Sequence, residues 1–423
     1  MREMKDSGIE WIGEIPKDWE VHPVYAYFEE GKTKNYRMQE KNLLSLSYGR
    51  IIRKDINTNG GLLPASFNTY NVIEAGDIII RPTDLQNDKR SLRTGLVKEQ
   101  GIITSAYIDL RPKDNVNSKY YHYLLHSYDI IKVFYNMGNG VRQGLNFSEF
   151  AKLLLLDPSK VQQQQIADFL DTKCSEIDAT VKDIQKEISL LEEYKKSVII
   201  EAVTKGLNPD AEMKDSGIEW IGEIPKDWEV HPVYVYFEEG KTKNYRMQEK
   251  NLLSLSYGRI IRKDINTNGG LLPASFNTYN VVEAGDIIIR PTDLQNDKRS
   301  LRTGLAKEQG IITSAYIDLR PKDNVNSKYY HYLLHSYDII KVFYNMGNGV
   351  RQGLNFSEFA KLLLLEPTTV EQQQIADYLD TKCSEIDTII ADKKRQLDIL
   401  ADYKKSLIYE YVTGKKEVPV KDF

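Results

Sequence analysis

The sequence has little of what secreted, membrane-embedded and strongly basic proteins depend on. Its 423 residues include two cysteines, too few for a disulfide framework. No apolar run is long enough to cross a bilayer, and the opening residues carry acids where a secretory signal would be apolar. Lysine and arginine (57) are outnumbered by aspartate and glutamate (61), which argues against a uniformly basic DNA-binding chain. We expect a cytoplasmic protein in which Cys174 and Cys383 are buried, reduced thiols.

An internal repeat predicts two domains. Residues 4–156 recur as residues 213–365 at a constant shift of 209 positions. A repeat of this length is a duplicated domain, because the units of solenoid proteins are far shorter. Any surface that one copy presents is therefore presented by the other. The copies differ only at Ala26 and Val235, Ile73 and Val282, and Val97 and Ala306.

Each copy is followed by a segment with the signals of one long helix. Ser159 with Gln162, and Thr368 with Glu371, form capping-box patterns at the two helix starts. These segments also hold the excess acid, with 7 bases against 12 acids in residues 157–212. The sequence therefore predicts a first globular domain at 1–158, a helix at 159–206, a second domain at 207–367, a helix at 368–414 and a tail at 415–423.

Each predicted helix carries an apolar seam. Apolar residues recur at alternating steps of four and three, as in a heptad repeat, with one polar interruption at Lys393. The seam consists of Leu170, Cys174, Ile177, Val181, Ile184, Ile188, Leu191 and Val198 in the first helix, and of Leu379, Cys383, Ile386, Ile390, Leu397, Leu400 and Leu407 in the second.

A seam of this length needs a partner helix, and the other copy is the nearest candidate. The second domain joins the end of the first helix to the start of the second. A parallel pair would force that domain to stretch back along the whole rod, whereas an antiparallel pair would not. We therefore expect an antiparallel coiled coil with the domains at opposite ends, related by an approximate two-fold axis. Homodimerisation of each helix with its own copy is the alternative.

Short strands at residues 77–81 and 102–110 and a helix near residues 119–134 predict a mixed fold for each copy. Basic residues within it are interleaved with aromatic and amide side chains, and residues 31–54 hold seven bases and one acid. Lysine and arginine attract phosphate, and arginine, asparagine and glutamine can read base edges. A solvated charged surface is the alternative interpretation. The candidate DNA-contacting residues are Lys32, Lys34, Asn35, Tyr36, Arg37, Tyr48, Arg50, Arg53, Arg81, Lys89, Arg90, Arg93, Arg142 and Gln143 in the first copy, and Lys241, Lys243, Asn244, Tyr245, Arg246, Tyr257, Arg259, Arg262, Arg290, Lys298, Arg299, Arg302, Arg351 and Gln352 in the second.

No enzymatic motif is complete. The Gly-Lys-Thr at residues 31–33 resembles the end of a phosphate-binding P-loop, but Ala26 stands where the first glycine would be. His122 and His126 could share a helix face, yet no glutamate or third ligand accompanies them in metalloprotease order. Core or surface histidines are the favoured interpretation of this pair.

Two further chemistries are also disfavoured. Asp84 and Asp88, next to Lys89, are more typical of ion pairing than of a nuclease. The chain contains no glycine-rich cofactor loop and no Asn-Pro-Pro-Tyr type motif of adenine methyltransferases. We expect no catalytic residue, no metal and no cofactor, so any catalysis must come from partner subunits.

Four phrases resemble HsdS, the specificity subunit of type I restriction-modification systems. They are MKDSGIEWIGEIPKDWEV from Met4, EAGDIIIRPTDL from Glu74, GIITSAYIDLRP from Gly101 and QQQQIADFLDTKCSEID from Gln162. The resemblance covers essentially the whole chain and rests on the order, spacing and duplication of these phrases. Gln162, where the family often has glutamate, and Asp157, where a Pro-Pro pair is common, depart from the pattern.

The resemblance implies an α+β architecture, with two near-identical mixed α/β target recognition domains joined by two long α-helices that pair as an antiparallel coiled coil. Each domain would read one half of a bipartite double-stranded DNA target. The helices would set the spacer and dock methyltransferase (modification) subunits, and restriction subunits would complete the assembly. A standalone DNA-binding regulator and a coiled-coil scaffold that does not read DNA are the alternatives.

Two nearly identical reading domains related by a two-fold axis read the same half-site in opposite orientations. We therefore expect an inverted-repeat target, in which a short specific block, an unspecified spacer and the reverse complement of the block follow one another. Most members of the family would instead read two different halves.

Arg142 and its counterpart Arg351 provide a first test of the candidate surface. Changing both to alanine is expected to weaken specific binding, because each arginine can pair with phosphate or with a guanine edge. Titration of a labelled target duplex measures the change, and unchanged affinity and motif would remove this pair from the candidates.

Overall fold

The computed structural model describes residues 2–419 apart from 58–63, 65, 84, 86–91, 138–143, 266–272, 274, 293, 295–300 and 347–352. The chain divides into two compact units, the first made of residues 1–184 and 394–423 and the second of residues 185–393. Each unit therefore holds one copy of the repeat and a part of both long helices. Among the described helices, none is sufficiently long and apolar to cross a membrane.

The first unit contains short strands around one buried helix. The helices of this unit are α1 (Ser118–Ile130), α2 (Phe147–Phe150) and the beginning of α3 (Lys160–Lys205). The strands are β1 (Met4–Asp6), β2 (Glu14–Pro16), β3 (Glu20–Pro23), β4 (Phe28–Glu30), β5 (Leu44–Ser47), β6 (Arg50–Arg53), β7 (Asn71–Ile73), β8 (Ile78–Ile80), β9 (Thr94–Leu96), β10 (Gly101–Ile103), β11 (Ile108–Pro112) and β12 (Leu154–Asp157).

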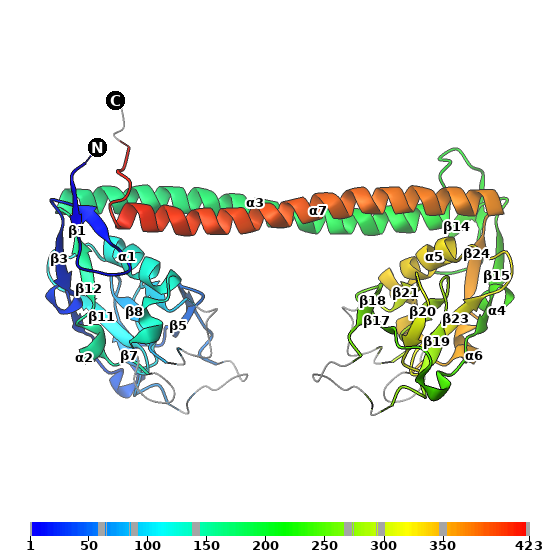
Figure 1. The fold of residues 1–423 in the computed structure, drawn as a ribbon, viewed down its shortest axis with the longest axis horizontal. Coiled ribbons are helices and arrows are strands. Elements are labelled where there is room, and N and C mark those ends of the chain that lie inside the picture. Colours follow the sequence, from blue (N-terminus) through cyan, green and yellow to red (C-terminus); the bar gives the residue numbers. More distant parts are fainter. Residues whose placement is uncertain are drawn as a thin grey trace. The chain divides into compact units, whose positions relative to one another are not determined.

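The largest sheet of this unit has four antiparallel strands in the order β4-β11-β8-β9, and β5-β6, β7-β10, β3-β12 and β1-β2 form smaller pairs (Figure 1). Helix α1 begins at Asn117, whose side chain accepts a hydrogen bond from Tyr120 N at 3.1 Å, the usual device for an N-cap. Tyr120, Leu124 and Tyr128 of this helix are buried against the sheet. The predicted helix near residues 119–134 is thus confirmed as far as Ile130.

The predicted strand at residues 102–110 is wrong as a single element. A turn at Thr104 divides it, with Tyr107 N donating to Thr104 O at 3.2 Å and Ala106 N to Thr104 Oγ1 at 3.3 Å. The two halves, β10 and β11, then pair in different sheets. The threonine side chain competes with the ladder for backbone hydrogen bonds here, which a continuous apolar pattern does not reveal.

The second unit repeats this fold. Its sheets correspond strand for strand, with β16-β23-β20-β21 as the counterpart of the largest sheet. The parallel pair Leu252–Ile311, which joins β17 to β22, corresponds to the parallel bridge Leu43–Ile102 of the first unit. Its helices are α4 (Val233–Tyr236), α5 (Ser327–Ile339), α6 (Phe356–Phe359) and the beginning of α7 (Thr369–Val412). The strands are β13 (Met213–Asp215), β14 (Glu223–Pro225), β15 (Glu229–Pro232), β16 (Phe237–Glu239), β17 (Leu252–Ser256), β18 (Arg259–Lys263), β19 (Asn280–Val282), β20 (Ile287–Ile289), β21 (Thr303–Leu305), β22 (Gly310–Ile312), β23 (Ile317–Pro321) and β24 (Leu363–Glu366).

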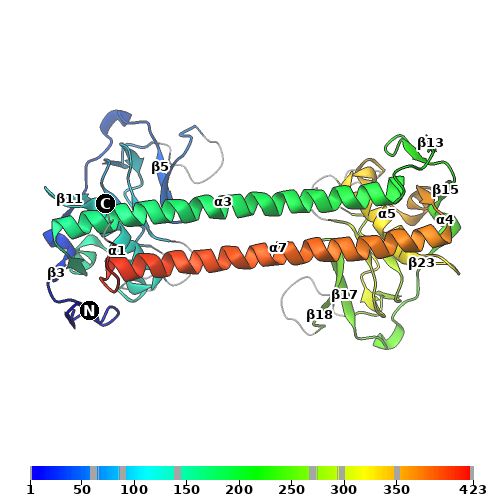
Figure 2. The ribbon, with the colours of Figure 1, turned by 90° about the horizontal axis from the view of Figure 1, so that it is seen from above.

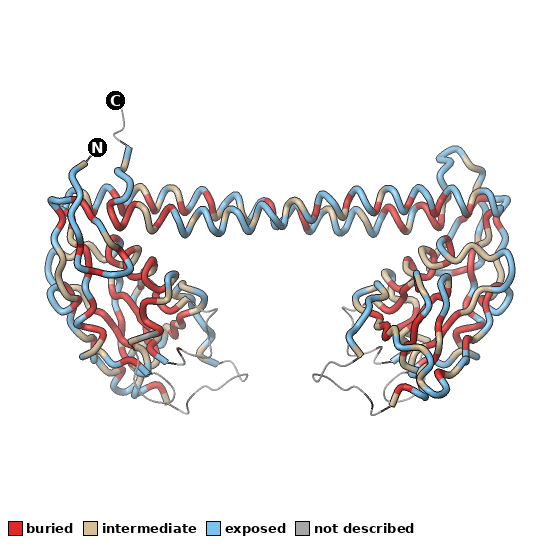
Figure 3. Tube along the Cα trace, in the orientation of Figure 1, coloured by how far each residue is buried: buried red, intermediate tan, exposed pale blue. Residues whose placement is uncertain are grey.

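The predicted apolar seam of α3 and α7 is largely buried, as the tube in Figure 3 shows within each unit. The thiols Cys174 and Cys383 lie in this seam and are free. Lys393, the polar interruption, is half-buried and forms an ion pair with Glu187 of α3. An ammonium on a long apolar stem can occupy a seam position because its charged end reaches the edge of the interface.

The two helices pack antiparallel inside each unit. In the first unit, Phe169 stacks against Tyr411, and Asp178 pairs with Lys404 at 2.7 Å. In the second unit, Lys195 pairs with Asp387 at 2.7 Å. Partner numbers fall on α7 as they rise on α3, which defines the antiparallel direction. In the first unit, both views show the end of α7 beside the start of α3 (Figures 1 and 2).

The two helix starts differ where Gln162 and Glu371 occupy equivalent positions. Ser159 and Gln162 form the predicted reciprocal capping box, with contacts of 3.1 and 3.3 Å. In the second unit, Thr368 Oγ1 accepts from Glu371 N, but the Glu371 carboxylate accepts from the indole of Trp228 at 3.0 Å. The equivalent indole nitrogen of Trp19 has no acceptor among the described residues.

Replacing Glu371 with alanine is therefore expected to cost more than replacing Gln162 with alanine. The first change leaves a buried indole donor without a partner, at about 1–3 kcal/mol, whereas the second removes a helix-start contact of about 1 kcal/mol. Denaturant unfolding followed by tryptophan fluorescence compares the two variants. Equal losses would contradict the assigned role of Glu371.

Candidate nucleic-acid interface

The basic segment that begins at Gly31 is held in place by the sheet beneath it. Gly31 N donates to Asp109 O at 2.9 Å, and a side chain at Gly31 would collide with the Asp109 carboxylate. Lys34 then pairs with Asn71 in an isolated bridge, and its ammonium donates to Asn71 Oδ1 at 2.7 Å. The segment is thus anchored at two points before its exposed part begins.

A tight turn at Tyr36–Met38 directs the exposed side chains outward. Arg37 and Met38 have positive φ angles of 57° and 50°, a conformation that L-residues adopt only when neighbours hold them. Asn68 accepts from Met38 N at 3.1 Å. Buried Asn35 bonds both backbone groups of Glu40, at 2.9 and 3.0 Å. The side chain of Tyr36 is 73% exposed as a result.

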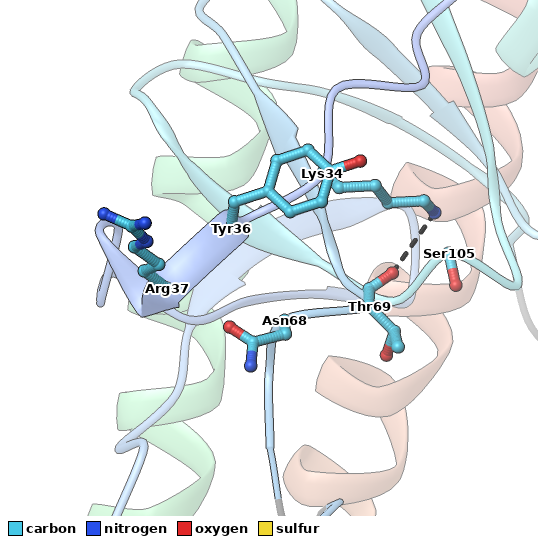
Figure 4. Close-up of a pocket in the computed structure, with 6 residues that line it drawn as sticks. All are labelled: Lys34, Tyr36, Arg37, Asn68, Thr69 and Ser105. Carbon is cyan, nitrogen blue, oxygen red and sulfur yellow. Dashed lines mark hydrogen bonds between the residues drawn. The ribbon is translucent and has the colours of Figure 1, made fainter.

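This turn borders a surface depression, which Figure 4 shows. The ammonium of Lys34 lies over its floor and donates to Thr69 O at 3.2 Å. A lysine, an arginine, an aromatic ring and several small polar groups converge here. Three of its lining residues, Asn68, Thr69 and Ser105, are not among the sequence candidates; the depression is lined by Lys34, Tyr36, Arg37, Asn68, Thr69 and Ser105.

The β5-β6 hairpin presents a second aromatic side chain. Tyr48 and Gly49 form its two-residue turn, and both have positive φ, as a type I′ turn requires. Tyr48 is 75% exposed. The turn approaches α1 closely, since a side chain at Gly49 would lie 3.3 Å from the His126 ring.

Several of the candidate basic side chains form ion pairs with acidic side chains of this chain. Lys32 contacts Glu30 at 2.7 Å, and Arg53 makes a two-pronged contact with Glu99. Arg50 contacts Asp178 of α3 at 3.3 Å. These side chains are 71–73% exposed, so solvent and salt screen the pairs. A phosphate can replace the acid beside Lys32 or Arg53.

Other candidates are buried. Arg93 is enclosed and donates to Tyr135 Oη at 3.1 Å and to Thr83 O at 2.5 Å. Asn35 is enclosed in the loop that it braces. Arg302 and Asn244 occupy the same positions in the second unit. We therefore assign these four residues to support of the loops rather than to the exposed surface.

Arg81 is half-buried, and its backbone N donates to Arg93 O at 2.9 Å. Arg290 occupies the same place in the second unit. Eight candidates lie outside the described residues, namely Lys89, Arg90, Arg142, Gln143, Lys298, Arg299, Arg351 and Gln352, as do the acids Asp84 and Asp88.

The contacts of the first unit recur in the second. Lys243 donates to Thr278 O at 3.2 Å and to Asn280 at 2.7 Å. Tyr245 and Tyr257 are 72% and 74% exposed. Lys241 pairs with Glu239, and Arg262 with Glu308. Both units therefore present the same exposed side chains.

A buried acid pair lies under the basic segment. Arg111 Nη2 lies 3.4 Å from Asp77 Oδ2 and 3.8 Å from Asp109 Oδ2, and both acids are at most 2% exposed. Burial, together with the neighbouring Asp77 carboxylate, raises the pKa of Asp109 to about 8. The guanidinium of Arg111 also donates to Thr33 Oγ1 at 3.3 Å. The acid pair is thus connected to the segment above it.

The histidines do not form a metal site with a third ligand among the described residues. Burial lowers the pKa of His122 to about 3 and that of His126 to about 4. Their rings lie 5.9 Å apart, and His126 Nδ1 contacts Thr94 Oγ1 at 3.2 Å. They are packed, half-buried side chains whose charged form is disfavoured by burial.

One side-chain cluster in each unit could hold a cation by geometry. Glu20, His22 and Asp157 place their ligand atoms within 4.8 Å of one another. His22 already contacts Glu20 at 2.9 Å, and Asp157 accepts from Tyr121 Oη at 2.9 Å. The hydrogen bonds within the cluster account for its geometry without an ion.

Comparison with known proteins identifies the class. Residues 28–190 and 233–398 match the family model of the type I restriction modification DNA specificity domain. The chain is 26% identical to the putative type I restriction enzyme MjaX specificity subunit of Methanocaldococcus jannaschii, over 96% of both chains. It is 22% identical to the type I restriction enzyme MjaVIII specificity subunit of the same organism, over 96% of this chain and 94% of the relative.

Solved structures share the fold. A chain from work on complex assembly and conformational transition of the type I R-M system aligns with a TM-score of 0.67 at 13% identity, over 95% of this chain and 99% of its own length. The HsdS subunit from Thermoanaerobacter tengcongensis aligns with a TM-score of 0.50 at 14% identity, over 95% and 98%.

The chain therefore belongs to the type I restriction modification DNA specificity family. Within that family it is of the HsdS type, with two specificity domains in one chain. The predicted family and α+β fold class are confirmed.

The acid pair yields a pH-dependent prediction. With a folded pKa of about 8 and an ordinary pKa near 3.8, Asp109 keeps its proton in the folded state where the unfolded chain has released it. Stability is therefore lost as pH rises from about 4 to 8, at up to about 1 kcal/mol per pH unit per site. Asp109→Asn with Asp318→Asn should gain stability relative to the native chain over this window.

The free energies of unfolding of the native chain and of the double asparagine variant, compared at pH 5, 6, 7 and 8, measure this difference in stability. Asp114→Asn with Asp323→Asn, which changes two exposed acids, is the matched control. A difference that does not vary with pH would contradict a protonated Asp109.

Proposed function

We propose that this chain is the DNA-recognition subunit of a cytoplasmic type I restriction-modification complex. Each domain reads one half of a bipartite duplex target, and partner subunits methylate and cleave. The observation that carries the proposal is that each domain repeats two exposed regions, one around Tyr36 and one around Tyr48, in which an exposed aromatic ring lies near exposed basic residues on a braced scaffold. Such a combination suits attraction of DNA phosphates together with contacts to the nucleobases.

Different members of this surface suit different parts of DNA. Lys32 and Arg53 are exposed and paired with acids of their own domain, so they can exchange a carboxylate for a phosphate. Arg37 and Asn68 border the depression and carry the paired donors and acceptors that read base edges. The exposed basic side chains that pair with acids would then contribute affinity for the phosphates, and the depression would contribute specificity for the base sequence.

Near-identity of the domains leads to an inverted-repeat target. The braced turn, the hairpin and the depression residues are conserved between the two copies in this chain, because none of the three differing positions lies among them. Antiparallel packing of α3 and α7 is compatible with a two-fold relation between the domains. Two equivalent domains in that relation read one block and its reverse complement.

The long helices have the features of a spacer and of a docking surface. They carry exposed apolar side chains outside the seam, including Leu190, Tyr194, Ile399 and Tyr403. Exposed apolar side chains gathered along one element are typical of protein contacts. We assign them to the methyltransferase subunits, with restriction subunits completing the complex.

Selection of bound duplexes from a randomised library tests the function, using the full chain coexpressed with its modification subunit. We expect a gapped palindrome with one spacer length, because two equivalent domains joined by one pair of helices would each read one half-site. A direct repeat or two unrelated halves would overturn the inverted arrangement. Recovery of no motif from a folded complex would overturn DNA reading itself.

The depression is tested by Arg37→Ala with Arg246→Ala. Binding to the selected duplex should weaken by about tenfold or more, as expected for the loss of one base contact of about 1–3 kcal/mol in each half-site. Tyr25→Ala with Tyr234→Ala, which removes exposed rings away from the depression, is the control.

A further inference from the structure

Each reading domain packs on the long helices through an apolar core and makes two ion-pair attachments to the helix that follows it. The first lies at Asp171 of α3, which contacts Lys119 at 2.6 Å and Tyr123 Oη at 2.8 Å, both from α1. The second lies at Asp178, seven residues and roughly 10 Å farther along the helix, where Arg50 of the hairpin arrives at 3.3 Å.

The second attachment, at Asp178, joins the hairpin to both long helices. Asp178 Oδ2 faces Arg50 of the globular domain, and its other oxygen, Oδ1, accepts from Lys404 of α7 at 2.7 Å. The Lys404 side chain is only 26% exposed. One carboxylate therefore connects the hairpin, α3 and α7, and its lysine contact is partly shielded from water.

The second unit contains the same arrangement with the helices exchanged. Arg259 contacts Asp387 of α7 at 3.2 Å, and Lys195 of α3 contacts the other oxygen of Asp387 at 2.7 Å. Its first attachment is equivalent as well, with Lys328 and Tyr332 both 2.8 Å from Asp380.

The apolar core and Asp171 hold the α1 side of the domain on the helices. The hairpin lies outside that core, because Leu44 and Leu46 pack in a separate cluster with Ile79, and Arg50 connects it to α3. The hairpin has little slack of its own, because Gly49 lies against Leu92 and His126 without room for a side chain. Holding Arg50 therefore holds the Tyr48 turn at a set position over α3.

We propose that Asp178 and Asp387 are positioning residues that fix the hairpin side of each reading domain on the helix pair and so narrow the range of spacer lengths that the target can have. This inference rests on the proposed DNA-reading function. The ion pairs with Arg50 and Arg259 are exposed, and such pairs contribute little to folding free energy. Their loss should change the geometry of reading more than the stability of the fold.

The test compares Asp178→Asn with Asp387→Asn against the native chain, each coexpressed with the modification subunit. Duplexes that carry the selected half-sites with the optimal spacer, or with one base pair more or fewer, are used as probes. The native chain should prefer the optimal spacer by at least tenfold. The double variant should keep the half-site sequence while that preference falls below about threefold.

Glu176→Gln with Glu385→Gln is the matched control. It makes the same charge change on the same helices, but these acids pair with Lys173 and Lys382 within their own helix. Its spacer preference should equal that of the native chain. Asp178→Glu with Asp387→Glu should restore most of the preference, which a general loss of stability would not explain.

An unchanged spacer preference in the asparagine variant, with the half-sites still read, would overturn the positioning role. If that variant unfolds, Arg50→Gln with Arg259→Gln releases the domain side alone and leaves the lysine contacts intact, and the same broadened preference is expected. Absence of any gapped motif for the native chain would instead count against the proposed function.

Discussion

Burial of the apolar stripe along α3 and α7 is the constraint on which each unit depends. In the first unit, a single core joins α1, represented by Tyr120 and Leu124, to Leu170 of α3 and Ile408 of α7. Tyr120 Oη also donates to Val412 O at 3.2 Å. Neither the globular domain nor the helix pair buries its apolar face alone. The orientation of a reading domain is therefore tied to the helices by the same contacts that stabilise the fold.

Exposed binding loops need rigid support, and here buried polar groups supply it. Asn35 satisfies the backbone of Glu40, Arg93 just before β9 donates to Tyr135, and Arg111 links the acid pair to Thr33. A buried charged or amide group that lost its partner would cost more free energy than the bond itself contributes. These groups hold the loops in conformations such as the positive φ of Arg37, and they leave Tyr36 free to face solvent.

The two copies differ in their junctions with the helices. Glu371 accepts from Trp228, whereas Gln162 completes a capping box and contacts Asp18. Asp157 and Glu366 likewise differ in length beside the histidine of each copy. The loops that we assign to DNA are unchanged between the copies, whereas the junctions with the helices differ. The two domains therefore share the same proposed DNA-contacting loops but differ in the residues at their junctions with the helices.

Much of this molecule could be predicted from its residues. Duplication, the two helices with their heptad seam and the start of α3 at Ser159 all follow from local periodicity and capping, because these depend on neighbours in the chain. Charge also indicated the exposed loop from Lys32 to Arg37. The same criterion selected Asn35 and Arg93, which are buried, and passed over Asn68 and Ser105, which border the depression.

Which candidate side chains are exposed and which are buried is determined by the tertiary structure. Whether an arginine faces solvent or the interior depends on partners distant in the chain, such as Tyr135 for Arg93 and Asp178 for Arg50. The turn at Thr104 that divides β10 from β11 likewise depends on which sheet each strand joins. Composition and spacing record what a side chain can bond, whereas only the packed fold determines which partner comes within 3 Å of it.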